Sequence, residues 1–91
     1  MSLDIAHDPA SRRFAIRVDG HEAELLYRRD GNRLTIDHTG VPEAIGGRGI
    51  AGELVKAALD FARAEGLRVV PACSYSAAYV QRHPEYADLV D

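Results

Sequence analysis

The sequence predicts an α+β fold: a three-stranded antiparallel meander, a glycine loop, a long helix, a further strand and a C-terminal helix. Two observations predict it. Apolar residues alternate with polar ones in the first part of the chain, and from residue 48 they recur at helical spacing. Turn sequences separate the alternating segments, as in hairpins. Because the chain has 91 residues, 46% of them hydrophobic, we expect a single domain over residues 1–91.

Three antiparallel strands are expected in the first part of the chain, at residues 12–18, 22–29 and 33–38. Asp19-Gly20 supplies a tight reversal after the first strand, and an Asp-Gly-Asn turn follows the second. In the third strand the alternation puts His38 on the apolar face with Leu34 and Ile36. For residues 1–11 two alternatives stay open, a partly disordered end or a short extra strand.

The second part of the chain changes period. A loop, a helix, a strand and a second helix are expected in that order at residues 39–47, 48–65, 67–72 and 74–82. Pro42 and the neighbouring glycines interrupt both periods in the loop. Gly66 suits the left-handed cap that ends the long helix, and Pro84 stops the second one.

Composition excludes several classes of protein. A formal net charge of -3 without a basic run argues against nucleic acid as a partner. Cys73 is the only cysteine, and without a CxxC or Cys/His cluster we expect neither a disulfide nor a metal site. A reducing cytoplasm is the expected location. No apolar run approaches the ~20 residues of a membrane span, and the first residues lack the stretch of a signal peptide, so no membrane partner is expected.

A glycine-rich turn leads into the long helix. The stretch IGGRGIAGEL, residues 45–54, holds four of the eight glycines, and bare amides at the positive end of a helix favour an anion site. Gly47, Gly49 and Gly52 also spell GxGxxG. A dinucleotide fold is excluded because a five-residue loop precedes the glycines, the next strand ends without an acid, and antiparallel strands come first. A phosphate-binding P-loop is excluded because Glu53-Leu54 replaces Lys-Ser/Thr. The alternative is that these glycines only permit a tight turn and close packing.

The turn resembles the GRGIA signature of the GNAT superfamily of acetyl-CoA-dependent acetyltransferases. More narrowly, four motifs in order are similar to the small single-domain GNAT-like N-acetyltransferase family: HTGVP (38–42), GRGIAGELVKAALDFARAEGL (47–67), VPACSY (70–75) and YVQRHPEY (79–86). The resemblance covers most of the chain from the first strand onward. It implies a minimal GNAT-like fold with acetyl-CoA as co-substrate.

The resemblance also implies a binding mode for coenzyme A, with the diphosphate on main-chain amides of the turn and pantetheine along the splayed third strand. The residues implied in cofactor binding are His38, Thr39, Val41, Gly46, Gly47, Arg48, Gly49, Ile50, Ala51 and Tyr75. Gly46 stands where the superfamily signature has Gln or Arg, so Arg48 is expected to supply charge instead. Amides near Val41 are expected to steady the oxyanion. For His38, a strand-end histidine that bonds the backbone remains an equal alternative.

Two residues are the candidates for catalysis. Cys73 lies where the last strand meets the second helix, whose dipole can stabilise a thiolate, and the family carries a proposed catalytic Cys in this context. It can act as general base or as acetyl carrier, and the alternative is a small buried hydrophobe. Tyr79, one helical turn from Tyr75 and His83, is expected to protonate the CoA thiolate as a superfamily tyrosine does. The alternative is that Tyr79 only packs the helix, with its hydroxyl group in solvent.

The expected function is therefore acetyl-CoA-dependent N-acetyl transfer to a primary amine. The acceptor is either a small molecule or an exposed lysine or terminus of another macromolecule. Two alternatives remain open. One is a non-catalytic CoA-binding or protein-interaction module, and the other is a structural domain without a ligand.

Overall fold

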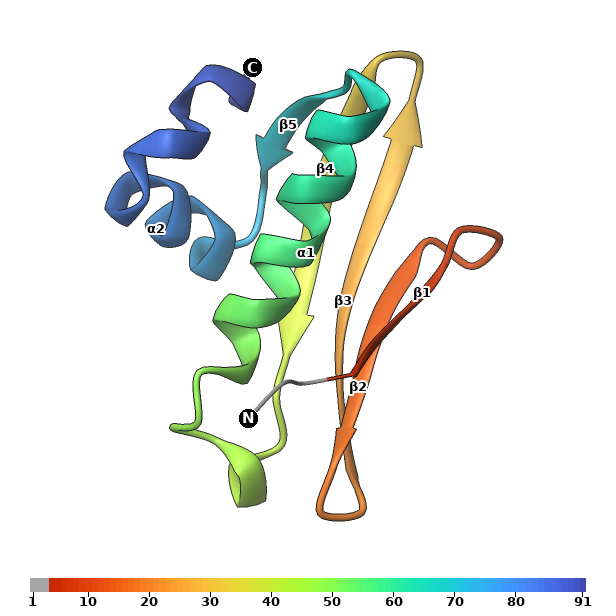
Figure 1. Ribbon diagram of the computed structural model, residues 1–91, viewed down its shortest axis with the longest axis vertical. Helices are drawn as coiled ribbons and strands as arrows, with labels where there is room; N and C mark the ends of the chain where they lie inside the picture. Colours follow the sequence, from red (N-terminus) through yellow and green to blue (C-terminus); the bar gives the residue numbers. More distant parts are fainter. Residues whose placement is uncertain (1–3) are drawn as a thin grey trace.

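Five strands form one sheet in the order β1-β2-β3-β4-β5 in the computed structural model, which describes residues 4–91 (Figure 1). The strands are β1 (Ile5–Asp8), β2 (Arg13–Val18), β3 (His21–Asp30), β4 (Arg33–Gly40) and β5 (Arg68–Pro71). The first four pair antiparallel, and β5 joins β4 in parallel after the chain crosses over through helix α1 (Ile50–Glu65). The predicted α+β class and the meander are confirmed.

Strand β1 lies within residues 1–11, where the sequence left disorder or an extra strand open; residues 1–3 of that segment lie outside the described residues. Its Ile5 and His7 pair with Ile16 and Phe14 of β2, on the face that α1 covers. The His7 ring stacks on Phe14 with centroids 4.0 Å apart, and Nε2 lies 2.6 Å from the hydroxyl oxygen of Tyr27. An aromatic cluster therefore attaches β1 to the sheet.

Helix α1 begins two residues later than predicted. Gly47 and Gly49 have φ of 77° and 75°, in the left-handed region that a right-handed helix excludes, so the first helical residue is Ile50. The end is as predicted, because Gly66 has φ of 70° and its N–H donates to the carbonyls of Ala62 and Arg63. The helix buries one stripe on the sheet: Ile50, Leu54, Val55, Ala58, Leu59 and Ala62. The predicted loop before it also contains a short 3-10 helix, η1 (Glu43–Ile45).

A bulge in β4 reverses which of its side chains face the core. Tyr27 of β3 pairs with Ile36, but the preceding Leu26 pairs with His38, so Asp37 is an extra residue in β4. Beyond the bulge, Thr39 pairs with the buried Leu25 and takes the covered face. His38 is exposed. The prediction that His38 lies on the apolar face is therefore wrong, because strict alternation fails across an inserted residue.

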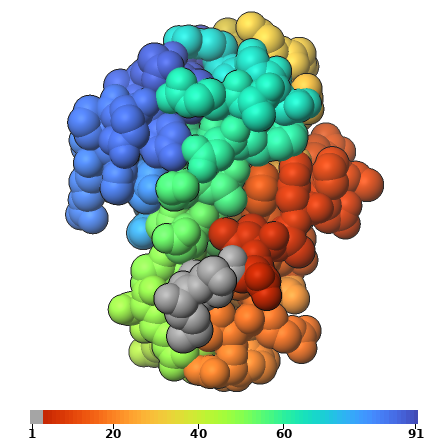
Figure 2. All heavy atoms as spheres, viewed as in Figure 1, coloured from red at the N-terminus to blue at the C-terminus, as the bar shows by residue number. Residues whose placement is uncertain are grey.

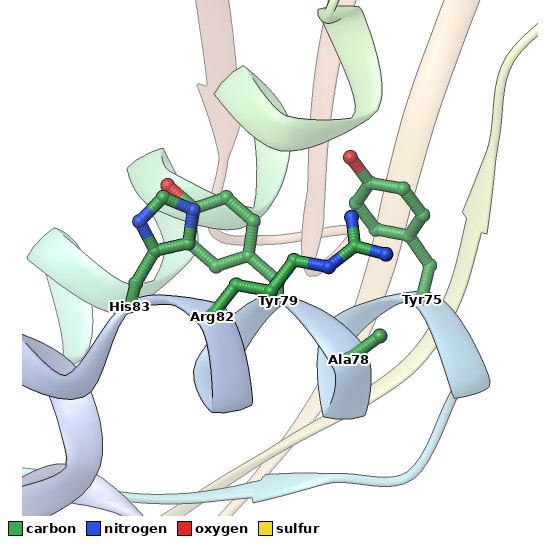
Figure 3. Close-up of a pocket in the computed structure, with 5 residues that line it drawn as sticks. All are labelled: Tyr75, Ala78, Tyr79, Arg82 and His83. Atoms are coloured by element: carbon green, nitrogen blue, oxygen red, sulfur yellow. The ribbon is translucent and has the colours of Figure 1, made fainter.

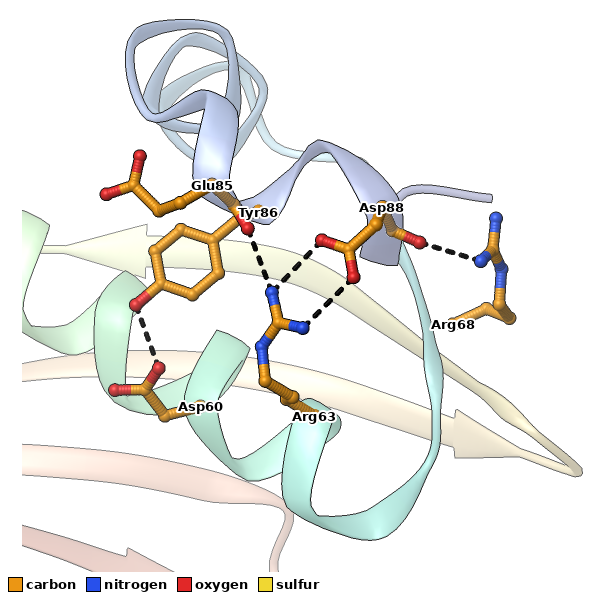
Figure 4. Close-up of polar contacts among 6 residues, drawn as sticks. All are labelled: Asp60, Arg63, Arg68, Glu85, Tyr86 and Asp88. Carbon is orange, nitrogen blue, oxygen red and sulfur yellow. Dashed lines mark hydrogen bonds and ion pairs between the residues drawn. The ribbon is translucent and has the colours of Figure 1, made fainter.

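Helix α2 (Ser74–Arg82) and the 3-10 helix η2 (Pro84–Leu89) follow β5, and α2 has the predicted bounds. Side chains of α1 and β5 hold the tail (Figure 4). The Tyr86 hydroxyl donates to Asp60 at 2.8 Å, and Arg63 donates two hydrogen bonds of 3.0 Å to Asp88. Arg68 donates to the carbonyl of Asp88 at 2.8 Å. Within residues 4–91 no helix is long and apolar enough to cross a membrane.

Candidate functional site

An opening between β4 and β5 lies at the carboxyl end of β4. The ladder between the two strands ends at Ile36 and Pro71, and the N–H groups of Ala72 and Cys73 both donate to the Ile36 carbonyl, at 3.1 and 3.0 Å. Beyond that point β4 continues to Gly40, whereas the segment that follows β5 turns away from β4 and enters α2. Within the described residues, the last part of β4 therefore has a partner strand only on its β3 side, as expected from the splay. Its other main-chain edge is open to a ligand that can pair like a strand.

The glycine turn forms the start of α1, close to the same end of β4. Gly49 is the N-cap residue and makes no side-chain capping bond, so the amides of the first turn depend on another partner. A Cβ built on Gly47 or Gly49 would meet no heavy atom within 4 Å. The surface beside these amides is thus open as well as positive. The donor set fits an anion such as a diphosphate.

Two of the predicted cofactor-binding residues in this turn already make hydrogen bonds within the protein. The Gly46 N–H donates to the Glu43 carbonyl at 3.0 Å and closes η1. The Arg48 guanidinium donates to Asp19 of the β2–β3 turn at 2.5 Å. Ile50 is buried, so only its main chain can face a ligand, whereas Ala51 is half-buried. Main-chain amides are therefore the groups of this turn that remain open to a ligand, while Arg48 is in an exposed ion pair.

Cys73 is the N-cap residue of α2, and its sulfur lies within hydrogen-bonding distance of Ser76 and Thr39. The Ser76 amide donates to Sγ at 3.4 Å, and the Ser76 hydroxyl oxygen lies 3.0 Å from it. Thr39 Oγ1 lies 3.6 Å away across the opening. Burial raises the pKa of the Cys73 thiol, but hydrogen bonds from Ser76, from Thr39 and from backbone amides outweigh it, so the net pKa is lowered. At a given pH, a larger fraction of Cys73 is therefore ionised to the thiolate than of an unperturbed cysteine.

Ser76 is a site residue that the sequence analysis missed. It is fully buried, and its hydroxyl donates to the Cys73 carbonyl at 2.9 Å while it contacts the sulfur. A signal was present, because a serine hydroxyl can donate to the carbonyl of the residue three positions before it. Ser76 thus fixes the position of Cys73.

The bulge decides which residues of β4 reach this cluster. Thr39 does, because it has moved to the covered face. The His38 ring instead lies over Gly40, where a Cβ would come within 2.8 Å of Nε2. Its side chain makes no hydrogen bond to residues 4–91, so the alternative in which His38 bonds a backbone group is absent from that range. Val41, half-buried, follows β4 and packs against the core.

The two tyrosines of α2 lie against the first turn of α1. A Cβ on Gly52 would come within 3.3 Å of Tyr75 Oη and 3.5 Å of Tyr79 Cε2, so this glycine permits the close approach. Tyr79 stacks on His83 with ring centroids 3.9 Å apart. Burial raises the pKa of Tyr79, with Lys56 acting in the opposite direction. The phenol therefore keeps its proton at neutral pH, as a general acid requires.

The open edge of β4, the uncapped glycine turn and a thiol at the head of α2 lie together at one end of the sheet. A family model described as GCN5-related N-acetyl-transferase matches residues 13–89, and the chain belongs to that family. This confirms the predicted resemblance.

Several individual proteins are similar to the chain. Protein NATD1 of Homo sapiens is 45% identical over 85 residues, which is 90% of this chain and 75% of that protein. Protein NATD1 of Gallus gallus is 44% identical, again over 90% of this chain, and 77% of its own length is covered. Among solved structures, the NMR solution structure of a GCN5-like protein from Staphylococcus aureus superposes with a TM-score of 0.77. It is 32% identical and covers 98% of this chain and 88% of its own.

Proposed function

We propose that this protein transfers the acetyl group of acetyl-CoA to a primary amine. One observation carries the proposal: the opening between β4 and β5 has a thiol of lowered pKa at its apex and an uncapped helix N-terminus beside it. A strand-like ligand with an anionic end suits both features. Pantetheine with its amides, followed by a diphosphate, is such a ligand. Acetyl-CoA supplies the activated acetyl group, and the protein supplies position and proton transfer.

In the proposed binding mode, the main chain of β4 around Thr39 and Val41 pairs with the pantetheine amides. The amides from Gly47 to Ala51 hold the diphosphate, with the helix dipole in support. Amides near Val41 steady the oxyanion that develops on the acetyl carbonyl. Since these contacts use backbone atoms, the loss of a Gln or Arg at Gly46 removes one side-chain contact and leaves the rest.

In the proposed reaction two side chains transfer protons. The amine nitrogen bonds to the acetyl carbon while the bond from that carbon to the CoA sulfur breaks. The Cys73 thiolate takes the proton that the amine loses, and Tyr79 gives its proton to the departing thiolate. In the covalent alternative, Cys73 first takes the acetyl group and then passes it to the amine. The lowered pKa of Cys73 and the raised pKa of Tyr79 support the protonation states from which the reaction starts, a thiolate and a neutral phenol.

The test has two stages. Titration calorimetry with acetyl-CoA measures binding, and incubation with labelled acetyl-CoA and a panel of amines and lysine peptides measures transfer. We expect binding by the wild type and by Cys73→Ala, and transfer that Cys73→Ala reduces by about 10²-fold or more. Intact mass of the wild type without acceptor separates the two routes, because only the covalent one leaves an acetylated Cys73.

Other outcomes would select an alternative. Binding without transfer to any amine favours a non-catalytic coenzyme-binding or protein-interaction module. No binding at all favours a domain without this ligand. Equal transfer by wild type and Cys73→Ala would remove Cys73 from the mechanism. Transfer to small amines or only to peptides would identify which of the two acceptor classes the open site takes.

A further inference from the structure

A hollow lies on the side of α2 that faces α1, lined by Tyr75, Ala78, Tyr79, Arg82 and His83 (Figure 3). We call it the α2 hollow. Its volume of 180 Å³ is below the ~300–1,000 Å³ of pockets that enclose a whole drug-sized ligand. It therefore suits a very small molecule, or one end of a molecule whose remainder lies outside the hollow.

The α2 hollow is open to solvent beside the first turn of α1. Tyr75 is 41% exposed, and Arg82 is exposed as well. Tyr75 Oη lies 3.3 Å from the position that a Cβ on Gly52 would take, so this ring reaches the start of α1. In Figure 2 the outline of the molecule is indented between the blue part, which includes α2, and the green part, which includes the first turn of α1. A ligand can therefore enter the hollow without a change in the fold.

The hollow contains a positive charge without a counter-ion. Every Lys and Arg of residues 4–91 except Arg12 and Arg82 is in an ion pair. Figure 3 shows the guanidinium of Arg82 between the rings of Tyr75 and Tyr79. A guanidinium binds carboxylate and phosphate groups with two parallel hydrogen bonds. The hollow is thus suited to an anionic group.

Tyr79 connects the hollow to the reaction of the proposed function. Its ring lines the hollow, and its hydroxyl is the proposed proton donor to the CoA sulfur. That sulfur is bonded to the acetyl carbon, and the amine of the acceptor attacks the same carbon. The hollow therefore adjoins the place where the acceptor reacts.

The spacing along α2 suits a single small acceptor. Arg82 follows Tyr79 by three residues, which places the two side chains on one face of the helix, about 4.5 Å apart along its axis. An anionic group at Arg82 and an amine near Tyr79 can thus belong to one molecule. The rings of Tyr75 and Tyr79 offer apolar surface to the atoms that join these two groups.

We infer that the α2 hollow binds an anionic group of the acceptor, so that the preferred acceptor is a small amine with a carboxylate or phosphate a few bonds from its nitrogen. The inference rests on the proposed function, because it takes the position of the acetyl group from the role of Tyr79. It names a residue for acceptor specificity, since Arg82 distinguishes an anionic amine from a neutral one of the same size.

The test measures kcat/KM for acceptors that differ in charge: β-alanine against β-alaninamide, and phosphoethanolamine against ethanolamine. The enzymes are the wild type, Arg82→Gln and Arg12→Gln. Arg12 is the matched control, because it is the other cation outside an ion pair within residues 4–91 and lies between β1 and β2. The amines of a pair differ in intrinsic reactivity, but that difference is the same for every variant and cancels when variants are compared.

We expect Arg82→Gln to lower the preference for the anionic member of at least one pair by about fivefold, as for a solvent-exposed charge pair. The pair that changes identifies the anion as carboxylate or phosphate. Arg12→Gln should keep the wild-type preference. Added salt should reduce that preference in the wild type, because salt screens an exposed charge.

Two further variants test whether the charge acts within the hollow. Arg82→Lys keeps the charge without the planar fork and should retain part of the preference. Ala78→Phe should fill the hollow and lower the preference as Arg82→Gln does, because Ala78 lines it. A wild-type preference in Ala78→Phe would contradict the assignment of the anionic group to the hollow. Thermal unfolding checks that each variant is folded.

The inference and the proposed function fail in different ways. A wild-type preference for both pairs in Arg82→Gln would overturn the inference, and so would transfer to lysine peptides but to none of the four small amines. Transfer itself would in either case still support the proposed function. If the wild type acetylates no amine, the proposed function fails and this inference fails with it.

Discussion

Gly49→Ala tests the turn on which the proposed function depends. Gly49 has φ of 75°, and a Cβ there would meet no heavy atom within 4 Å, so the substitution introduces backbone strain without a clash. A non-glycine residue in this conformation costs about 1–2 kcal/mol. Each 1 kcal/mol lowers the melting temperature of a domain of this size by about 4–8 °C. We therefore expect Gly49→Ala to melt about 5–15 °C below the wild type.

Gly31→Ala is the matched control. Gly31 has φ of 59°, its Cβ would also meet nothing within 4 Å, and it lies in the turn between β3 and β4, at the opposite end of the molecule from the glycine turn (Figure 1). Both variants should lose similar stability. Only Gly49→Ala should lose affinity for acetyl-CoA, by about tenfold or more, because hydrogen bonds to a charged group contribute ~1.5–3 kcal/mol.

The assays are thermal unfolding by circular dichroism and calorimetric titration with acetyl-CoA well below both melting temperatures. Wild-type affinity in a less stable Gly49→Ala would refute the reasoning, since the amides of this turn would then not hold the diphosphate. An equal loss of affinity in Gly31→Ala would attribute the effect to general instability instead.

Three further predictions follow from single side chains. Ser76→Ala removes a hydrogen bond that lowers the pKa of Cys73, so the pKa of the thiol should rise. The pH dependence of alkylation by iodoacetamide measures this pKa. An unchanged pH profile would contradict the role of Ser76. Tyr86→Phe removes the bond to Asp60 and should cost about 1 kcal/mol of unfolding free energy at neutral pH. Burial, with the bond to Asp60, raises the pKa of Tyr86 from 10.0 to about 12, so the unfolded chain releases this proton first and the wild type loses stability as the pH rises between those values. Urea unfolding should show a smaller loss over that range in Tyr86→Phe. Burial lowers the pKa of His7 from 6.5, with Asp8 acting in the opposite direction, so the unfolded chain binds this proton first as the pH falls. Stability should decline below pH 6.5 in the wild type and less steeply in His7→Gln, and identical slopes would show that His7 does not contribute.

Local chemistry explains why parts of the fold could be predicted. The meander follows from alternation and turn residues, and Gly66 ends α1 because a left-handed cap favours glycine. The bounds of α2 follow from its N-cap position and from Pro84, which cannot continue the helix. These signals lie within a few residues of the structure they produce.

The candidate site was only partly predictable. The sequence indicated a glycine turn and a cysteine at a helix start, and the structure has both. It gave the wrong face for His38, because no local signal marks a bulge between β3 and β4. The predicted first residue of α1 was too early in the chain, because apolar spacing does not reveal the positive φ of Gly49.

The amino-acid sequence by itself determined the order of the elements, the glycine turn and the family. Only the tertiary structure decided that Thr39 faces Cys73, that Ser76 fixes the sulfur and that Arg82 has no counter-ion within residues 4–91. The physical reason is range. Turns and caps depend on neighbours in the chain, whereas the register of β4 depends on two other strands, and the partner of a charge depends on every element that packs near it.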